Sequence, residues 1–156
     1  MKKLMIFFLF LPFLCAAQTT VGSMKMTVVI GLNISNINKM NFGTITTTDA
    51  GTITIGELGR TFTGGAVASG DFSADNYNLK GGSGLTVGVS LATSATVSNG
   101  VTTINIINFT SNSTDGKITL GADGTFQLRI WATAVIPQIV TGGNYVGTYS
   151  FTTSYQ

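Results

Sequence analysis

Hydrophobic residues occupy every second position near both ends of the chain, which is the pattern of a β-strand with one apolar face. Near the N-terminus the alternating residues are Met24, Met26, Val28, Ile30, Leu32 and Ile34. At the C-terminus they are Tyr145, Gly147, Tyr149, Phe151 and Tyr155. Because successive side chains of a strand point to opposite faces, each end presents an apolar stripe that requires burial. The stripe is buried either in the chain's own fold or in that of a partner.

Short alternating runs separated by turn residues fill the rest of the chain, and no stretch has a convincing helical period. The interior pattern predicts strands at residues 40–45, 52–55, 60–63, around Phe72, 85–91, 101–109, 117–120 and 125–136. The parity change at Ile106-Ile107 predicts a bulge. This spacing of strands predicts one all-β domain, an immunoglobulin-like antiparallel β-sandwich.

The first 17 residues have the composition of a bacterial signal peptide. Two lysines precede an apolar run over residues 4–14, and Cys15-Ala16-Ala17 supplies small residues for cleavage before Gln18. The run is shorter than the roughly 20 residues that cross a bilayer. We therefore expect a secreted domain over residues 18–156, with residues 18–34 as a candidate donor strand that a partner would bury. Lipid attachment at Cys15 is an alternative to simple cleavage.

Charge and composition exclude several classes of function. Without Lys2 and Lys3, six basic residues balance six acidic residues, so no basic surface favours nucleic acid. The chain contains no His, and its single Cys lies in the predicted leader, so we expect neither an enzyme nor a cofactor or metal site. We expect no membrane span after removal of the leader. A nearly uncharged polar surface also favours association.

Trp131 is the single tryptophan and a candidate ligand contact. It shares a strand face with Arg129, opposite Phe126, Leu128 and Ile130. An exposed indole on that face would bind a sugar by stacking. The alternative is an indole packed against the second sheet or beneath a loop.

Two short segments carry a family resemblance. Asn41-Phe42-Gly43-Thr44-Ile45 resembles the N-F-G-T-I/L segment of secreted bacterial β-sandwich domains. Gly147-Thr148-Tyr149-Ser150-Phe151, leading to Tyr155, resembles their C-terminal strand. The chain thereby resembles an uncharacterised, domain-of-unknown-function family of such domains. That family is similar to spore coat protein U-like domains, which include subunits of archaic chaperone–usher pili.

The resemblance implies a subunit whose sandwich lacks one strand and is completed by a neighbour. Met24, Met26, Val28, Ile30 and Leu32 would then be donor-strand residues, and the C-terminal strand would face a periplasmic chaperone. Copies of the chain or related subunits and an outer-membrane usher would be its other partners. The disulfide of many related pilins is absent here. Two hypotheses remain open: a surface-fibre subunit with a role in adhesion, and a self-contained surface or secreted module that binds glycan or protein.

Overall fold

The computed structural model describes Ser23, residues 25–26, Val28 and residues 30–156. The predicted signal peptide, its cleavage site before Gln18, and Met24 lie outside the described residues. Every regular element in the described part is a β-strand. The strands are β1 (Asn33–Asn38), β2 (Thr44–Gly56), β3 (Gly59–Ser69), β4 (Asp75–Lys80), β5 (Thr86–Leu91), β6 (Ser94–Ser98), β7 (Thr103–Ser111), β8 (Lys117–Thr119), β9 (Thr125–Ile136), β10 (Val146–Thr148) and β11 (Phe151–Tyr155).

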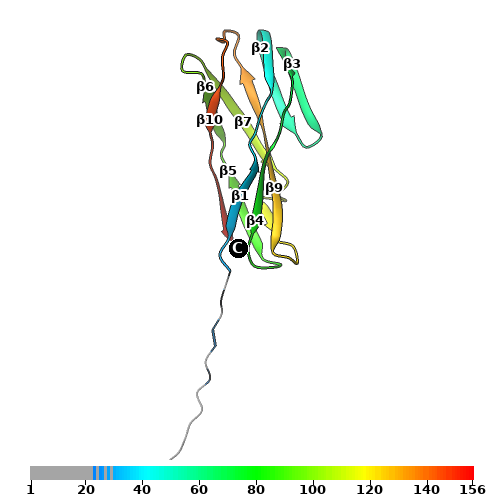
Figure 1. The fold of residues 1–156 in the computed structure, drawn as a ribbon, viewed down its shortest axis with the longest axis vertical. Helices are drawn as coiled ribbons and strands as arrows, with labels where there is room; N and C mark the ends of the chain where they lie inside the picture. Colours follow the sequence, from blue (N-terminus) through cyan, green and yellow to red (C-terminus); the bar gives the residue numbers. More distant parts are fainter. Residues whose placement is uncertain (1–22, 24, 27, 29) are drawn as a thin grey trace, which may run out of the picture.

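Strand β9 organises the larger of two antiparallel sheets. On one edge it pairs with β4 along its first half and with β2 along its second half, and on the other edge it pairs with β7. Strands β1, β3, β6 and β10 extend this sheet through β4, β2, β7 and β6 respectively. Strands β11, β5 and β8 form the smaller sheet. Figure 1 shows the resulting elongated, curled sandwich, which confirms the predicted all-β antiparallel fold.

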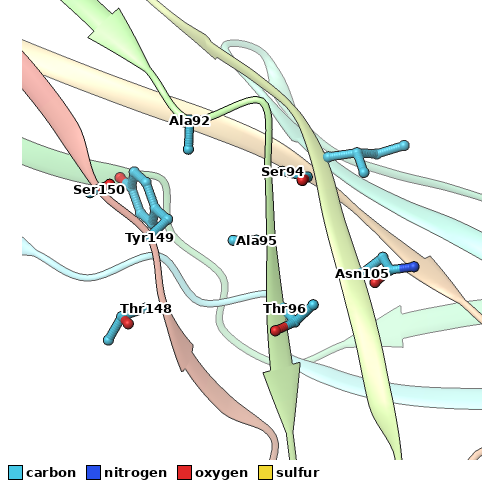
Figure 2. A pocket seen from close by; sticks show the side chains of 9 residues that line it. Ala92, Ser94, Ala95, Thr96, Asn105, Thr148, Tyr149 and Ser150 are labelled. Carbon is cyan, nitrogen blue, oxygen red and sulfur yellow. The ribbon is translucent and has the colours of Figure 1, made fainter.

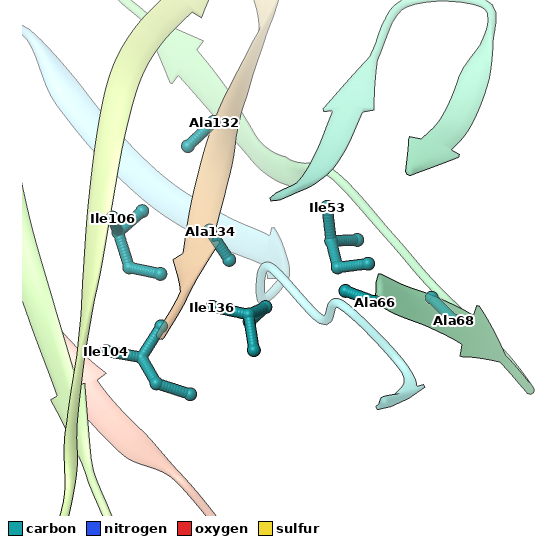
Figure 3. Close-up of a cluster of buried hydrophobic side chains, with 8 residues drawn as sticks. All are labelled: Ile53, Ala66, Ala68, Ile104, Ile106, Ala132, Ala134 and Ile136. Atoms are coloured by element: carbon teal, nitrogen blue, oxygen red, sulfur yellow. The ribbon is translucent and has the colours of Figure 1, made fainter. Parts of the chain in front are cut away.

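The core consists of two clusters of inward-facing side chains, and β9 contributes to both. Leu128 and Ile130 belong to the cluster that includes Leu79 and Val87. Farther along β9, Ala132, Ala134 and Ile136 belong to a second cluster (Figure 3), together with Ile53, Ala66, Ala68, Ile104 and Ile106. The alternation predicted for residues 125–136 therefore identified the inner face of the central strand correctly.

Shortening Leu128 should be strongly destabilising, because this side chain has no exposed surface. We expect Leu128→Ala to lower the free energy of unfolding by about 2–5 kcal/mol, through lost burial and the cavity left behind. Urea unfolding measures the change. Gln127→Ala, which alters the exposed neighbour on the opposite face, should change it by about 0.5 kcal/mol or less.

The N-terminal strand lies farther along the chain than the hydrophobic pattern predicts. It begins at Asn33, and β1 continues through residues 35–38, beyond Ile34, the last residue of the alternating stripe. The side chains of β1 are all exposed, and the strand is held by its backbone register with β4, for example Asn36 opposite Tyr77. An edge strand paired in this way does not require a continuous apolar stripe, so hydrophobic periodicity placed it wrongly.

Other strands also differ from the predicted ones in extent or number. Residues 48–51, which separate the predicted strands 40–45 and 52–55, lie within β2, at a register shift between Thr47 and Gly51. Strand β3 continues past Gly64-Gly65 to Ser69, Phe72 lies between strands, and β6 was not predicted. The bulge in β7 lies between Ile107 and Thr110, close to its predicted place, where Asn108 has φ 54°.

Candidate functional site

Strands β1 and β11 each have a strand partner on one edge only within the described part of the chain. Strand β1 pairs with β4, and β11 pairs with β5 from Phe151 opposite Leu91 to Tyr155 opposite Val87. The Gln156 N–H donates to the Thr86 carbonyl (3.1 Å). Because hydrogen-bonded pairs alternate along an antiparallel ladder, the backbone N–H and C=O groups of Phe151, Thr153 and Tyr155 point away from β5.

Apolar side chains face inward beside these open edges, which we call the β1–β11 seam. Phe151 and Tyr155 are half-buried against the core, and the Phe151 ring contacts the edge of Tyr77 at a centroid distance of 4.7 Å. Ile34 pairs with Leu79 and therefore points to the same face. Leu79 is fully buried, yet Ile34 is 40 % exposed. The sandwich thus leaves inward-facing apolar surface uncovered at the seam.

The Tyr155 phenol ties Ile30 to the end of the seam. It accepts a hydrogen bond from the Gly82 N–H (3.0 Å) and donates one to the Ile30 carbonyl (2.9 Å). Leu32 packs against the core of its own chain. Met26 and Val28 are 85 % and 80 % exposed.

A buried carboxylate links the two walls of the seam. Asp75 on β4 is 5 % exposed and accepts hydrogen bonds from Asn36 Nδ2 (2.7 Å), the Tyr77 hydroxyl (3.1 Å) and the Tyr149 hydroxyl (2.8 Å). The Tyr149 ring also stacks on Phe109 at a centroid distance of 4.7 Å. Asn36 belongs to β1, while Tyr149 lies between β10 and β11. These four polar residues, the Asp75 cluster, fix both terminal segments to the same strand.

The cluster favours neutral phenols. Burial, followed by the hydrogen bond to Asp75 and its charge, raises the pKa of Tyr149 far above its usual value. Burial and the Asp75 charge also raise the pKa of Tyr77. An ionised phenol in this position would be poorly solvated and would face a carboxylate. Both hydroxyl groups therefore act as hydrogen-bond donors to Asp75.

The free energy of unfolding should fall as the pH rises above the ordinary tyrosine pKa of 10.0. There the unfolded chain releases phenolic protons that the folded chain retains, because the folded pKa is raised; below that pH the contribution is complete. Tyr149→Phe has no such proton, so its free energy of unfolding should fall less steeply. Urea unfolding from about pH 8 to about pH 11 compares the slopes. Equal slopes would contradict the role assigned to Tyr149.

Comparison with known families decides where the chain belongs. Residues 32–155 match the family described as "Domain of unknown function (DUF4402)". The chain is a member of this family. The matched segment contains every strand from β1 to β11, so the DUF4402 domain is the whole sandwich described above. Neither the curated proteins nor the solved structures contain a match to the chain.

The Asn41–Ile45 segment has a structural role in this DUF4402 domain. The Asn41 side-chain oxygen accepts a hydrogen bond from the Gly43 N–H (2.9 Å), and the Asn41 backbone pairs with Ser73. Arg60 Nη1 donates to the Phe42 carbonyl (2.8 Å). Gly43 has φ +84°, and a side chain at this position would collide with the Arg60 guanidinium. This turn places Thr44 and Ile45 at the start of β2. It lies in the link between β1 and β2 and contributes no group to the seam.

The predicted C-terminal strand is two strands of the DUF4402 domain, in different sheets. Tyr145 packs on the core and its hydroxyl donates to the Thr141 carbonyl (2.6 Å), while Gly147 pairs with Val97 in the larger sheet. The chain then crosses at Tyr149 to the smaller sheet, where Phe151 and Tyr155 lie. The inward parity predicted for these residues is correct, since the aromatic rings pack on the core clusters.

Trp131 does not form a ligand platform. It is 5 % exposed, so a sugar cannot stack on its indole, and the alternative of a packed ring describes it. Burial is not visible in the alternation of β9, because the strand is covered on both faces from Ile130 to Ala134. Within the described residues there is also no helix long and apolar enough to cross a membrane.

Proposed function

We propose that this domain is a structural subunit of a bacterial surface fibre that assembles by donor-strand exchange and has a role in adhesion. The β1–β11 seam is the observation that carries this proposal. It combines unpaired backbone groups at Phe151, Thr153 and Tyr155 with the uncovered, inward-facing side chain of Ile34. A strand added at an open edge supplies main-chain hydrogen bonds, and its alternate side chains cover apolar surface.

The N-terminal arm, defined as residues 18–29, has the properties of the missing strand. Its apolar residues Met24, Met26 and Val28 alternate, and the two described ones are almost fully exposed. Burying three such side chains at up to ~2 kcal/mol each supplies several kcal/mol, from which the cost of association is subtracted. Methionine side chains also adapt to irregular apolar surfaces.

The structure favours insertion into a second copy rather than into the same chain. Ile30 is held by its own Tyr155, and Met26 and Val28, which the structure describes, leave most of their side-chain surface exposed. The segment 24–28 is as long as β11, which has five residues. A donor that leaves one subunit and enters the next makes a heterologous contact, and repeated contacts of this kind form open filaments.

The remaining parts of this proposal concern transport. The predicted leader would direct the chain through the inner membrane to the periplasm. There a chaperone would cover the seam until an outer-membrane usher joins subunits at the cell surface. The exposed apolar surface supports such a helper, because open apolar edges aggregate when they are unpaired.

Deletion of residues 18–28 tests the proposal. We expect the secreted polymer to be lost, because the seam of each subunit then receives no donor from its neighbour. A synthetic peptide of residues 20–30 should bind the shortened chain and raise its melting temperature, while the same peptide with Met26→Ser and Val28→Ser should not. Unchanged polymers after the deletion, or an unaltered monomer that ignores the peptide, would favour the self-contained binding module.

A further inference from the structure

A groove of about 600 Å³ lies between the C-terminal segment and strands β6 and β7. It opens where the chain after β10 departs from β6 and crosses to the smaller sheet (Figure 2). Its volume is within the range of small-ligand sites. The groove is lined by Ala92, Ser94, Ala95, Thr96, Asn105, Ile107, Thr148, Tyr149 and Ser150.

The lining is polar but carries no charged group. Hydroxyl groups of Ser94, Thr96 and Thr148 and the amide of Asn105 are exposed there. None of the hydrogen bonds within the described residues involves these four side chains, so they are available to a ligand. Ile107 and the alanines add small apolar surfaces between them. Such a lining favours a neutral ligand that has both hydroxyl groups and C–H faces.

Tyr149 gives the groove a rigid aromatic wall. Its hydroxyl is held by Asp75, and one side of its ring stacks on Phe109. Figure 2 shows the ring beside the groove, across from β6. An immobilised ring loses little conformational entropy when a ligand packs on it. A second hollow of about 230 Å³, beside Lys117 and Gln156, has no aromatic residue in its lining.

We infer that this groove binds a neutral oligosaccharide, with its C–H faces against Tyr149 and Ile107 and its hydroxyl groups bonded to Asn105 and the β6 side chains. A peptide strand fits less well. On the edge of β6 that faces the groove, β10 already pairs with Thr96 to Ser98, so only Ser94 and Ala95 lack a strand partner on that edge. An anionic glycan would find no cation among the lining residues. The groove shares Tyr149 with the Asp75 cluster, but its lining does not include Ile34, Phe151, Thr153 or Tyr155 of the seam, so ligand binding does not depend on fibre assembly.

Glycan binding by the whole secreted chain tests the inference. The probes are neutral hexasaccharides of glucose, mannose, galactose and N-acetylglucosamine, with a uronic acid hexasaccharide as the charged comparison. We expect at least one neutral probe to bind and the charged one to bind more weakly. Ser94→Trp, which fills the groove from an exposed position, should weaken binding by about ten-fold or more. Thr61→Trp, at an exposed hydroxyl position of β3, should leave it unchanged.

Asn105→Ala provides a second variant that adds no bulk, and it should also weaken binding. Failure of every neutral probe to bind the wild-type chain, or equal binding by Ser94→Trp and Asn105→Ala, would overturn the inference. The two functions are separable. Ser94→Trp should still assemble, whereas deletion of the arm should stop assembly and leave the groove able to bind the probe.

Discussion

Replacing Thr153 with proline should stop subunit assembly while leaving the sandwich folded. The Thr153 N–H points away from β5, so its loss removes no hydrogen bond of the existing ladder. It removes a donor from the middle of the edge to which we assign the incoming strand, and the proline ring also obstructs close approach there. We expect a cost of about 1 kcal/mol in the folded domain and loss of high-mass polymer.

Thr152→Pro is the matched control, because the Thr152 N–H points toward Ser90 of β5. This substitution should destabilise the domain by about 3 kcal/mol through a broken ladder bond. Circular dichroism and urea unfolding measure the fold, and size-exclusion chromatography with electron microscopy measures assembly. A Thr153→Pro chain that is folded and polymerises like the wild type would contradict donor-strand addition at β11.

Replacing Asp75 with alanine should have the largest effect among the polar residues. The substitution leaves the hydroxyls of Tyr77 and Tyr149 and the amide of Asn36 without their shared acceptor. A buried donor left without a partner costs roughly 1–3 kcal/mol. We expect the free energy of unfolding to fall by about 2–4 kcal/mol, since Asn36 can reach water and recover part of the loss.

Two further variants show whether the loss of stability comes from the Asp75 cluster or from the removal of any acidic residue. Asp71→Ala, at an exposed position, should change the free energy of unfolding by about 0.5 kcal/mol or less. A double-mutant cycle of Asp75→Ala and Tyr149→Phe should show coupling of about 1 kcal/mol or more, because the two residues form one network. Additive effects would mean that Asp75 stabilises the domain without holding the C-terminal segment.

The boundary between the N-terminal arm and the folded domain is set by tertiary contacts and not by the hydrophobic pattern. Alternation from Met24 to Ile34 is continuous, so it gives no point at which the chain passes from arm to body. That point is set by Tyr155, which binds the Ile30 carbonyl, and by the core contact of Leu32. Tyr155 and Ile30 lie more than a hundred positions apart in the sequence, and Leu32 contacts a core built from several strands. Local periodicity carries no information about such contacts.

The Asp75 cluster was missed for a related reason. Asp75 resembles any other acid near a Gly-rich segment, and the sequence offers no charged partner to mark it. Its donors come from β1, from its own strand and from the crossing before β11. The single available signal was the alternation of β4, in which Asp75 shares parity with Tyr77 and Leu79 and so faces inward.

The sequence by itself determined the fold class and the inner faces of β9 and β11. These follow from side-chain alternation and composition, which are local properties. Only the tertiary structure decided that Trp131 is covered, that the C-terminal segment divides between two sheets, and that β1 and β11 keep open edges. Those features depend on which strands become neighbours, and that choice is made by the packing of the whole sandwich.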